Sequence, residues 1–557
     1  MFLKNNILPK IIVSLQVLTF LFYLALFFMK KIILTSLLFT SLVQAQNPGN
    51  YDVTFDTDGK LYSQNALPVS GMKKSFIQSN TIYSFYNQFD ATNNVERGLY
   101  LLKSNMDGSV ITNIDLEPDF LLRPQEVIQL ASGKFLVASL VIFTDPNTTN
   151  HREYPDIRRF NSDGTLDVTF GLNGKVGFPQ SYHPQNKPGT CDIAIDATGK
   201  IYIAYQTESS TFAGRSRIKI EKYTANGATD NFSFTVGSGD ENFDIQDLLI
   251  DNTNKILVAA VNGASPSDAV KPYRNTLYKF TSTGSYDVTF DTDGKLAFAD
   301  GVPTDTYGNK LPMNLVQDNT NRLLATLSVY NPTTISAAYP APISFLKRMD
   351  NNGVEISKTF TGKIVLNDIK IDAANNAVLT GYINNAVASD SNYTQDGYTM
   401  RVTDGFTFDN TFDSDGKKTI SFGQNSYFIQ LAHVLIQPVD QKLLYTGMSS
   451  DIYDNLVLVR LHAGISVGID NAYYTSTKST AYPNPTTTNE ISIQAGFVIT
   501  AATDLHITDL KGNTIAINSY VENDVLKINT TNLATGIYTY TILQGKEYTQ
   551  GKFQVIK

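Results

Sequence analysis

The chain is poor in the residues that build disulfides and metal sites. Its 557 residues include a single cysteine, Cys191, and no tryptophan. One cysteine excludes an intrachain disulfide and any zinc site made from cysteines. The histidines lack the spacing of metal ligands, and there are five of them: His151, His183, His433, His462 and His506.

Catalytic and phosphate-binding motifs are also missing. The sequence contains no Gly-x-Ser-x-Gly elbow, no phosphate-cradling loop and no dinucleotide fingerprint. Basic runs are absent outside the N-terminal segment, and the formal net charge is −8. We therefore expect no nucleic-acid partner and no cofactor, and the sequence names no catalytic residue. The 42% of apolar residues suffices for a globular core.

Two apolar runs open the chain. Residues 11–29 and 32–42 are separated only by two lysines. The first run has about the length of a membrane span, so an N-terminal anchor is one interpretation. We expect instead that Met29 is the true start and that residues 1–28 are an upstream extension of the reading frame.

Read from Met29, the second run forms a signal peptide over residues 29–45. A basic region precedes the apolar stretch, and small residues suit cleavage between Ala45 and Gln46. Residues 1–45 are therefore interpreted as a targeting region, and the mature protein is expected outside the cytoplasm.

A repeat of about 59 residues runs through the rest of the chain. Glycines that each follow a strand-like run recur from Gly49 to Gly464, and these 415 residues in seven steps set the period. They are Gly49, Gly108, Gly164, Gly227, Gly284, Gly353, Gly405 and Gly464. A period of this length indicates a repeat architecture.

Each repeat contains four short strand-like segments. A tight turn after the first segment lets Asp bond its own backbone and Gly or Asn take positive φ. Such turns occupy residues 196–199, 251–254, 318–321 and 372–375. The third segments are residues 99–103, 157–160, 218–223, 277–280, 345–349, 398–402 and 456–461. Fourth segments follow an Asp-Gly or Asn-Gly turn at residues 60–62, 175–178, 295–298 and 417–420.

Four antiparallel strands per repeat, without helical periodicity, predict an all-β fold. Radial repetition lets each twisted sheet bury both faces against its neighbours, so we expect a seven-bladed β-propeller of four-stranded blades over residues 46–468. A linear β-solenoid is the alternative. The chain enters with a fourth-type segment and its last repeat ends with a third-type segment. We therefore expect residues 60–62 to complete the last blade and cover its open edge.

Four of the repeats carry a ten-residue motif. Residues 51–60 read Tyr-Asp-Val-Thr-Phe-Asp-Thr-Asp-Gly-Lys, and residues 166–175, 286–295 and 408–417 follow the same pattern. This motif resembles the delta-60 repeat family, and the resemblance covers residues 49–464. The repeats that start near Gly108, Gly227 and Gly353 keep the motif only loosely.

The carboxylates of the motif have two interpretations. Clustered oxygens suit calcium, but the glycine falls at the fourth loop position and a lysine at the fifth, unlike an EF-hand. Asp-Gly is also a favoured hairpin dipeptide. We therefore expect turns, with structural calcium as the alternative, at Asp56, Asp58, Asp291, Asp293, Asp413 and Asp415. The motif phenylalanines are expected in the core, at Phe55, Phe170, Phe290 and Phe412.

The connections between second and third segments differ most from repeat to repeat. Strand alternation places all of them on one face of the predicted disc, where repeat proteins often bind partners. Tyrosines near these connections are candidate ligand contacts, and they are Tyr154, Tyr273, Tyr339, Tyr393 and Tyr453.

The C-terminal residues 481–557 change character after a linker at residues 469–480. Alternating runs predict a small immunoglobulin-like β-sandwich. Its motifs are Tyr482-Pro483-Asn484-Pro485, the Leu-Ala-Thr-Gly-Ile-Tyr run that holds Gly536 and Tyr538, and the terminal Lys557. This set resembles type IX secretion system C-terminal sorting domains. The resemblance implies that residues 481–557 engage that machinery in a Gram-negative bacterium. A generic immunoglobulin-like module is the alternative.

These patterns predict a secreted or cell-surface propeller that binds a glycan or a protein. The alternative is a secreted hydrolase that acts on a polymeric substrate at the propeller channel. A hydrolase should show carboxylates, or a carboxylate and a histidine, that converge in the channel with perturbed pKa values.

Overall fold

The computed structural model describes most of the chain from residue 48 onward. The described ranges are residues 48–56, 58–62, 69–78, 80–90, 95–117, 122–144, 151–177, 189–208, 215–237, 241–263, 273–303, 311–330, 341–385, 394–422, 428–437, 440–450, 454–463, 475–476, 478–499, 504–509, 515, 517–544 and 547–557. The predicted cleavage site at Ala45 and Gln46 lies outside them. Every regular element in these ranges is a strand, and no helix there has the length and hydrophobicity of a membrane span.

Seven four-stranded antiparallel groups precede the C-terminal part. Sheet 1 comprises β2 (Val69–Gln78), β3 (Thr81–Asp90), β4 (Val95–Asn105) and β5 (Val110–Asp115). Sheet 2 comprises β6 (Leu122–Gln129), β7 (Phe135–Thr144), β8 (His151–Phe160) and β9 (Lys175–Gly177). Sheet 3 comprises β10 (Cys191–Ile195), β11 (Ile201–Glu208), β12 (Ser216–Tyr223) and β13 (Thr229–Val236). Sheet 4 comprises β14 (Asn242–Ile250), β15 (Ile256–Gly263), β16 (Arg274–Phe280) and β17 (Lys295–Ala297).

The remaining three groups follow the same order. Sheet 5 comprises β18 (Met313–Gln317), β19 (Leu323–Tyr330), β20 (Pro342–Asp350) and β21 (Gly353–Phe360). Sheet 6 comprises β22 (Ile364–Ile371), β23 (Ala377–Asn384), β24 (Gln395–Val402) and β25 (Lys417–Ile420). Sheet 7 comprises β26 (Phe428–Ile436), β27 (Leu443–Ser450), β28 (Asp454–Leu461) and β1 (Lys60–Tyr62). A single parallel bridge, Gln395 to Phe428, joins sheets 6 and 7.

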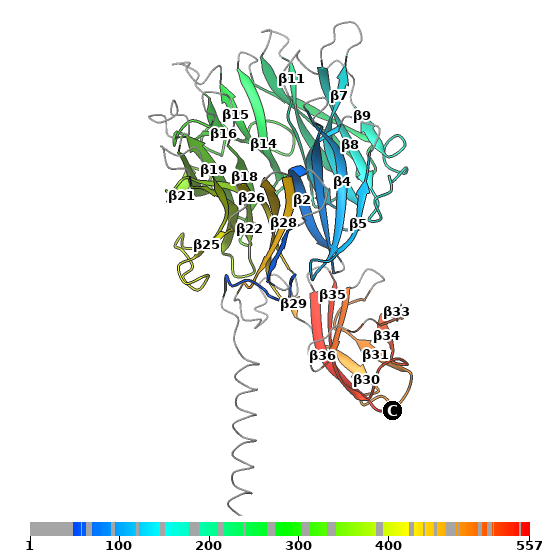
Figure 1. Ribbon diagram of the computed structural model, residues 1–557. Coiled ribbons are helices and arrows are strands. Elements are labelled where there is room, and N and C mark those ends of the chain that lie inside the picture. Colours follow the sequence, from blue (N-terminus) through cyan, green and yellow to red (C-terminus); the bar gives the residue numbers. More distant parts are fainter. Residues whose placement is uncertain are drawn as a thin grey trace, which may run out of the picture.

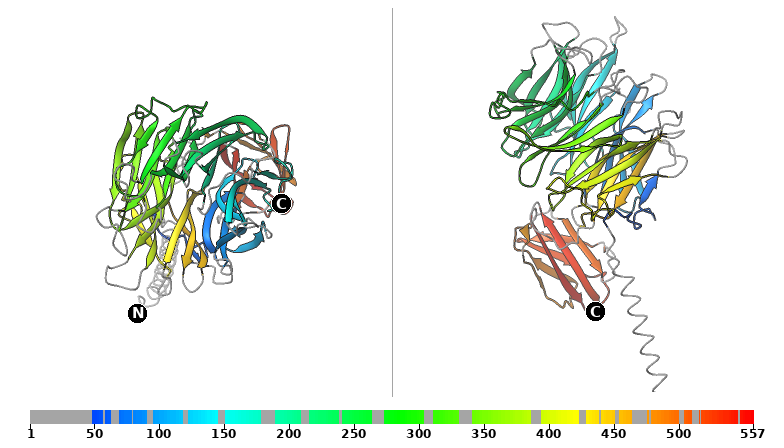
Figure 2. Two further views of the ribbon diagram at one scale, coloured as in Figure 1. Left: turned by 90° about the horizontal axis from the view of Figure 1, so that it is seen from above. Right: turned by 90° about the vertical axis from the view of Figure 1, so that its left-hand side faces the viewer.

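The sheets resemble propeller blades in their arrangement. The first strand of each sheet contacts the first strand of the next, and β26 returns to contact β2, so these strands form a closed cycle. Figures 1 and 2 show the gold strands of sheet 7 lying beside the blue strands of sheet 1. The second strands, such as β15, are buried almost throughout, whereas the fourth strands, such as β13, alternate exposed and half-buried residues.

The tight turns form as the sequence predicts. In sheet 3, the Asp196 carboxylate accepts hydrogen bonds from the backbone N–H groups of Thr198 and Lys200. The last turn position takes positive φ in Gly199, Asn254, Asn321 and Asn375. These residues tolerate the left-handed conformation better than most others. The first hairpin of each of these sheets is thereby fixed in register.

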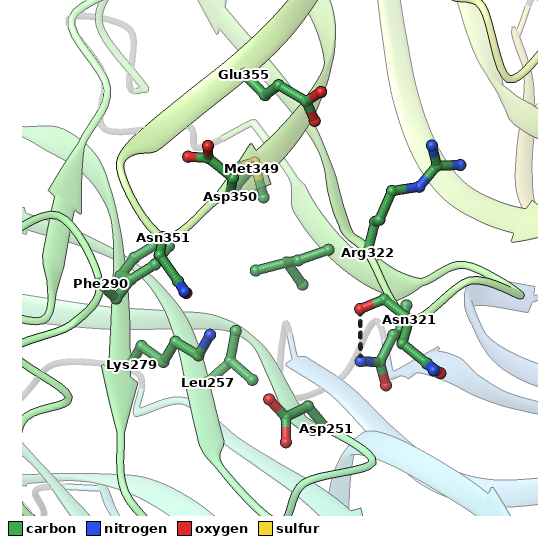
Figure 3. Close-up of a pocket in the computed structure, with 12 residues that line it drawn as sticks. Asp251, Leu257, Lys279, Phe290, Asn321, Arg322, Met349, Asp350, Asn351 and Glu355 are labelled. Carbon is green, nitrogen blue, oxygen red and sulfur yellow. Dashed lines mark hydrogen bonds between the residues drawn. The ribbon is translucent and has the colours of Figure 1, made fainter.

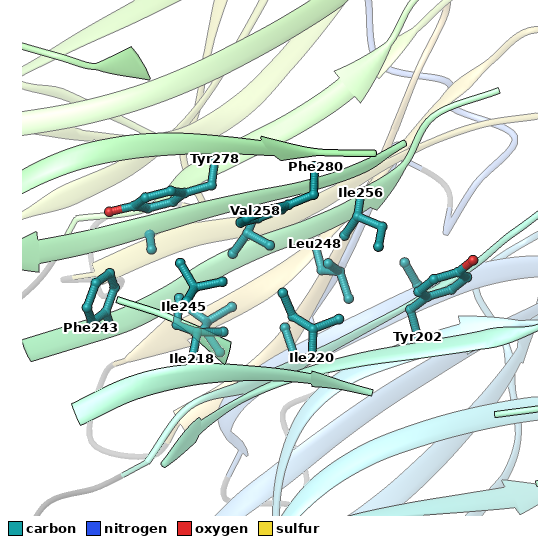
Figure 4. Close-up of a cluster of buried hydrophobic side chains, with 14 residues drawn as sticks. Tyr202, Ile218, Ile220, Phe243, Ile245, Leu248, Ile256, Val258, Tyr278 and Phe280 are labelled. Carbon is teal, nitrogen blue, oxygen red and sulfur yellow. The ribbon is translucent and has the colours of Figure 1, made fainter. Parts of the chain in front are cut away.

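Apolar side chains fill the space between neighbouring sheets. In the cluster of Figure 4, Ile218 and Ile220 of sheet 3 face Ile245 and Val258 of sheet 4. Burial of each such side chain contributes about 1.5 to 3 kcal/mol. Equivalent clusters occupy the other contacts between sheets. The predicted core phenylalanines Phe55, Phe170, Phe290 and Phe412 are all buried, with at most 1% of their surface exposed.

The ten-residue motif joins one sheet to the next. The motif precedes the fourth strand in sheets 2, 4, 6 and 7, whereas the fourth strand of sheets 1, 3 and 5 forms a hairpin with the third. At each motif, the residue after the phenylalanine donates its backbone N–H to a carbonyl across the junction. In sheets 2, 4 and 7 the acceptor lies in the turn before the fourth strand of the following sheet, and in sheet 6 it lies in the segment just before the motif of sheet 7. The pairs are Asp56 to Asp107, Gly171 to Asn226, Asp291 to Asn351, and Asp413 to Pro48.

Charged motif side chains reinforce three of these junctions. In sheet 7, the buried Asp52 carboxylate pairs with Arg460 at 2.6 Å, and the Arg460 guanidinium lies 5.0 Å from the centre of the Phe55 ring. The same guanidinium donates a hydrogen bond to the Met106 carbonyl of sheet 1. Equivalent sets join sheets 2 and 3 through Asp167, Arg159, Phe170 and Ala225, and sheets 6 and 7 through Asp409, Arg401, Phe412 and Ala463.

The repeated glycines lie at these junctions, with one difference in backbone conformation. Gly108 has φ of +91°, and a Cβ there would approach the Phe55 ring to 3.2 Å. Glycine is therefore required by both the backbone conformation and the close neighbour. In sheet 6, however, Phe406 takes the left-handed conformation with φ of +60°, and the neighbouring Gly405 does not. Gly464 lies outside the described residues.

The N-terminal strand closes sheet 7, which confirms the predicted pairing. Lys60, Leu61 and Tyr62 of β1 pair in antiparallel register with Val459, Leu458 and Val457 of β28. The preceding motif takes part as well, since Tyr51 forms a bridge to Leu461. The edge of β28 is therefore covered by the start of the chain.

The C-terminal residues form two further four-stranded sheets. One contains β29 (Thr475–Ser476), β36 (Glu547–Val555), β35 (Gly536–Gln544) and β32 (Asp504–Asp509). The other contains β30 (Thr480–Tyr482), β31 (Glu490–Gln494), β34 (Val525–Asn529) and β33 (Ser519–Glu522). Side chains of both sheets, including Ile493, Ile528, Ile542 and Phe553, form one buried cluster.

Candidate functional site

The acidic turn residues of the motif have structural contacts. Asp58, Asp293 and Asp415 each accept a hydrogen bond from the backbone N–H of the lysine two residues later. Asp56, Asp291 and Asp413 take positive φ between 43° and 46°. In the described ranges, no group of three or more His, Cys, Asp or Glu side chains is arranged to hold a metal ion. Structural calcium at these turns stays a prediction.

Two of the five candidate tyrosines lie in the described part of the chain. Tyr154 is half-buried in β8, directly after the connection at residues 145–150, and burial raises the pKa of its hydroxyl. Tyr273 is half-buried just before β16, and its hydroxyl accepts a 3.5 Å hydrogen bond from Asn242. Both tyrosines belong to the face that carries the second-to-third-strand connections. Tyr339, Tyr393 and Tyr453 lie outside the described residues.

A set of polar and ionisable side chains converges at the centre of the ring, and the sequence analysis did not identify it. One residue on the first strand of each sheet lies at the same register position, opposite the second strand. These residues are Lys74, Glu126, Asp192, Asp247, Asn314, Asp368 and His433, and we call them the central ring. In five of the seven strands a β-bulge lies just before this position, and bulges commonly redirect side chains in this way.

Carboxylates of the central ring bind the next sheet. Asp192 accepts a hydrogen bond of 2.7 Å from the backbone N–H of Leu248, and Asp247 accepts one of 2.5 Å from Leu315. Asp368 accepts a 3.0 Å hydrogen bond from Val434. Each donor is the residue directly after the central-ring residue of the following sheet. These three carboxylates therefore fasten neighbouring first strands together.

Charge is unevenly distributed around the central ring. Burial raises the pKa of Asp247 to about 7, although the Leu315 N–H and Lys74 oppose the shift. Burial also raises the pKa of Asp192, with the neighbouring Glu126 and Asp247 carboxylates adding to the effect. For Asp368 burial acts in the same direction, but Lys370 and His433 outweigh it and hold the pKa well below the usual range.

Lys74 and Glu126 form an ion pair within the central ring. Their charged groups lie 3.0 Å apart, and about a quarter of each side chain is exposed. Burial disfavours the Lys74 ammonium, but Glu126, Asp368 and Asp247 outweigh it, so the pKa of Lys74 rises. The central ring thus places a buried carboxyl group of raised pKa beside other charged groups, an arrangement that is more frequent at functional sites than elsewhere.

The sequence contains a signal for the central ring that the repeats make visible. Each of its members precedes the first residue of the tight turn by four positions, as Asp192 precedes Asp196 and Asp247 precedes Asp251. A carboxylate inside an otherwise apolar strand is costly to bury unless it is hydrogen-bonded. Its repetition at one position of several repeats therefore indicates a shared contact.

The sorting-motif residues cluster at one end of the C-terminal sheets. Asn484 accepts a hydrogen bond from the Gln554 N–H and donates one to the Lys552 carbonyl. The Tyr538 hydroxyl donates a hydrogen bond of 3.0 Å to the Ala534 carbonyl, next to Gly536. Lys557 donates its backbone N–H to the Thr535 hydroxyl. Tyr482 ends β30, and both Pro483 and Pro485 follow cis peptide bonds.

The described sheets define an all-β protein whose repeated four-stranded antiparallel units resemble propeller blades. Its C-terminal part is a sorting domain: residues 480–557 match the family model described as Secretion system C-terminal sorting domain. That domain implies export by the type IX secretion machinery to the cell surface or beyond it. No curated protein matches the chain.

Solved structures with similar folds share very little sequence with this chain. The polysaccharide lyase Uly1 is 10% identical, with 76% of this chain and 98% of that chain covered and a TM-score of 0.40. The β-propeller domain of the Trilobed protease from Pyrococcus furiosus is 9% identical, with 72% and 99% covered and a TM-score of 0.37. Drosophila Semaphorin 1a, extracellular domains 1-2, is 9% identical, with 72% and 88% covered and a TM-score of 0.39. These likenesses carry no argument about a ligand or a reaction.

Proposed function

We propose that this chain is a seven-bladed β-propeller with a C-terminal β-sandwich that is exported by type IX secretion and binds an extracellular glycan or protein. Its binding surface is the face formed by the connections between second and third strands. The delta-60 resemblance of the motif and the signal peptide at residues 29–45 belong to this proposal. The closed cycle of first strands and the pairing of β1 with β28 support the ring.

The difference between the two faces carries the proposal. On the face of the tight turns, the motif residues are engaged between sheets through hydrogen bonds, ion pairs and aromatic contacts. On the opposite face, the connections differ from three residues at 451–453 to eleven at 331–341. Variable connections held by a fixed scaffold are a common location for binding sites. Tyrosines beside them supply amphipathic contact area.

Binding to a panel of purified polysaccharides and surface proteins tests the proposal, with the chain that begins at Gln46. We expect Tyr154→Ala and Tyr273→Ala to weaken retention of the captured ligand by about tenfold or more. Asp58→Asn is the matched control, because Asp58 lies on the opposite face. Equal retention of all three variants would contradict the assignment of the binding face.

The central ring favours a second candidate, a hydrolase of polymeric substrates. Asp247 has a pKa of about 7, and the charges of Lys74 and Glu126 both act on that pKa. In the same panel, release of new chain ends would indicate this reaction. We then expect Asp247→Asn and Glu126→Gln to abolish release while Tyr154→Ala retains it. Ligand retention without release favours the binding module.

A further inference from the structure

A cavity lies between sheets 4 and 5, on the face of the tight turns. Its volume is about 250 Å³. Figure 3 shows Lys279 and Leu257 of sheet 4 facing Asn321 and Arg322 of sheet 5 across it. We call this space the 4–5 pocket. It lies on the opposite face from the proposed binding surface and away from the central ring, so nothing assigned above uses it.

Replacement of one arginine accounts for the side of the pocket formed by sheet 4. Lys279 occupies the third-strand position that Arg159, Arg401 and Arg460 occupy in the other motif-bearing sheets. Those guanidinium groups lie over the motif phenylalanine and donate a hydrogen bond to a carbonyl across the junction. The Lys279 ammonium also lies over its phenylalanine, Phe290, at 5.2 Å from the ring centre. It donates no such hydrogen bond to any described residue across the junction, so the space stays open.

A shortened turn accounts for the side formed by sheet 5. In sheets 1 and 3, five residues, 105–109 and 224–228, separate the last paired residues of the third and fourth strands. In sheet 5 the last pair is Asp350 with Gly353, so only two residues, 351 and 352, lie between the strands. The turn that approaches sheet 4 is therefore shorter here than at the equivalent junctions. Both changes enlarge the same space.

Within the described part of the chain, the charges around the pocket leave the Lys279 ammonium without a counter-ion. The motif carboxylate Asp287, whose equivalents pair with arginine, is bound to Lys255 at 2.6 Å. Arg322 pairs with Asp318 and Asp404. Among the described residues, the Lys279 ammonium has no ion pair or hydrogen bond. Burial and the neighbouring Lys255 lower its pKa, against the attraction of Asp251 and Asp287.

The other lining groups indicate a ligand that is polar as well as anionic. Three carboxylates line the pocket, and the Arg348 guanidinium pairs with that of Glu355. Asp251 uses Oδ1 to accept hydrogen bonds from Thr253 and Lys255 of its own turn, and no described residue donates one to its Oδ2. Asp350 accepts the Asn352 N–H at Oδ1 and a long 3.4 Å hydrogen bond from the Asn352 side chain at Oδ2. Oxygens that remain can accept hydrogen bonds from hydroxyl groups. Leu257, Leu323 and Met349 add an apolar wall. A cationic group on the ligand would be repelled by the Lys279 ammonium, whereas hydroxyl groups would not be.

We infer that the 4–5 pocket binds a small hydroxylated organic acid, of the size and kind of a sugar acid. Lys279 is the counter-ion of the ligand's carboxylate, and Asp251 and Asp350 accept hydrogen bonds from its hydroxyl groups. The pocket is a binding site separate from the proposed surface on the opposite face, and either assignment can fail without the other.

Isothermal titration of the chain that begins at Gln46 tests this site, with D-glucuronate as the probe. D-glucose is the uncharged probe with the same ring, inorganic phosphate tests for a simple anion site, and L-glutamate tests for an amino acid. We expect binding of glucuronate and at least about tenfold weaker binding of the other three. Equal binding of glucose, phosphate or glutamate would overturn the assignment of the ligand class.

Three variants locate the binding. Lys279→Met removes the charge, and Lys279→Arg supplies the guanidinium that fills the equivalent space at the other junctions. We expect both to weaken glucuronate binding by at least about tenfold, with the melting temperature of Lys279→Arg unchanged or raised. Lys103→Met is the matched control, because Lys103 holds the same third-strand position in sheet 1 and does not line the pocket. Unchanged binding in a folded Lys279 variant, or no binding by the wild type at millimolar concentration, would overturn the inference.

Discussion

At the scale of the residue, the aspartate at the second position of the motif links several charged and polar groups. Asp52 is fully buried and pairs with Arg460 and Lys442, and it accepts a hydrogen bond from the Thr54 hydroxyl. Burial acts to raise the pKa of Asp52, but the contacts with Thr54, Lys442 and Arg460 outweigh it and lower the pKa to about 2. The folded state therefore stabilises the ionised carboxylate.

Asp52→Asn should lower the free energy of unfolding by about 3 to 5 kcal/mol near neutral pH, because it leaves the buried Arg460 guanidinium without its counter-ion. The folded pKa lies below the usual value of 3.8. The contribution of Asp52 is therefore complete above pH 3.8 and is lost as the pH falls through about 2. Denaturant unfolding at a series of pH values measures it, and the difference between wild type and variant should shrink in acid.

The exposed Asp58 of the same motif serves as the control for this experiment. Asp58→Asn should change stability by no more than about 0.5 kcal/mol at any of these pH values. A difference for Asp52→Asn that does not depend on pH would contradict the ionic explanation.

The motif phenylalanine gives a second prediction at this scale. Phe290 is 1% exposed, and Phe290→Ala should lower the free energy of unfolding by about 3 to 5 kcal/mol. Val288, two residues earlier, is 65% exposed, so Val288→Ala should change stability by less than about 0.5 kcal/mol. A loss below about 1 kcal/mol for Phe290→Ala in thermal or denaturant unfolding would mean that the ring is not packed as described.

Single residues were predictable where the repeats agree in sequence. The burial of the phenylalanines and the positive φ of the turn residues followed from their repetition at one position. The positive φ of Phe406 was not predicted, because a bulky residue rarely takes that conformation. The central ring was not predicted because only four of its seven members are carboxylates, and Lys74, Asn314 and His433 interrupt that pattern.

At the scale of the element, β1 shows how few residues can close a sheet. Three residues pair with β28, and the motif before them adds the ion pair of Asp52 with Arg460. Without β1 the edge of β28 would be open to pairing with another chain. The sequence allowed this prediction because the first and last strand types are complementary.

A disulfide between β1 and β28 tests this pairing directly. Lys60 and Val459 lie opposite each other in register, so Lys60→Cys with Val459→Cys should form a disulfide and raise stability by about 2 to 4 kcal/mol. Mass spectrometry and unfolding with and without reductant measure both effects. The single native cysteine, Cys191, is buried.

The control for the disulfide shifts one partner by two residues. Lys60→Cys with Val457→Cys places the cysteines on a diagonal, too far apart for bond formation without backbone movement. Efficient oxidation of this second pair would show that the register differs from the one described.

The fourth strands were predictable only in part. In sheets 2, 4, 6 and 7 an Asp-Gly or Asn-Gly turn marks their start, and all four were expected. In sheets 1, 3 and 5 no fourth strand was predicted, although β5, β13 and β21 each span six to eight residues. These strands lie at the outer edge of their sheets and carry many exposed polar residues, so their hydrophobic pattern is weak.

At the scale of the whole molecule, the repeat length and the order of strands were enough to predict propeller-like sheets. The position of the sorting domain also followed from its motifs, and residues 480–557 match that family. The candidate functional sites could not be predicted from the sequence, because the central ring and the 4–5 pocket depend on which repeats become neighbours. Lys279, for example, lines a pocket only because the turn of the following sheet lies beside it.

The two kinds of fourth strand have a consequence for how such a molecule changes in size. Sheets whose fourth strand forms a hairpin (1, 3 and 5) alternate with sheets that carry the motif (2, 4 and 6). A ring with an odd number of sheets cannot alternate throughout, so sheets 6 and 7, which both carry the motif, are neighbours. Their junction is the place where the parallel bridge between Gln395 and Phe428 links two sheets. An eighth sheet with a hairpin fourth strand, inserted between sheets 6 and 7, would restore the alternation of the two kinds around the ring. Insertion of a repeat at this junction would therefore disturb the other contacts between sheets least.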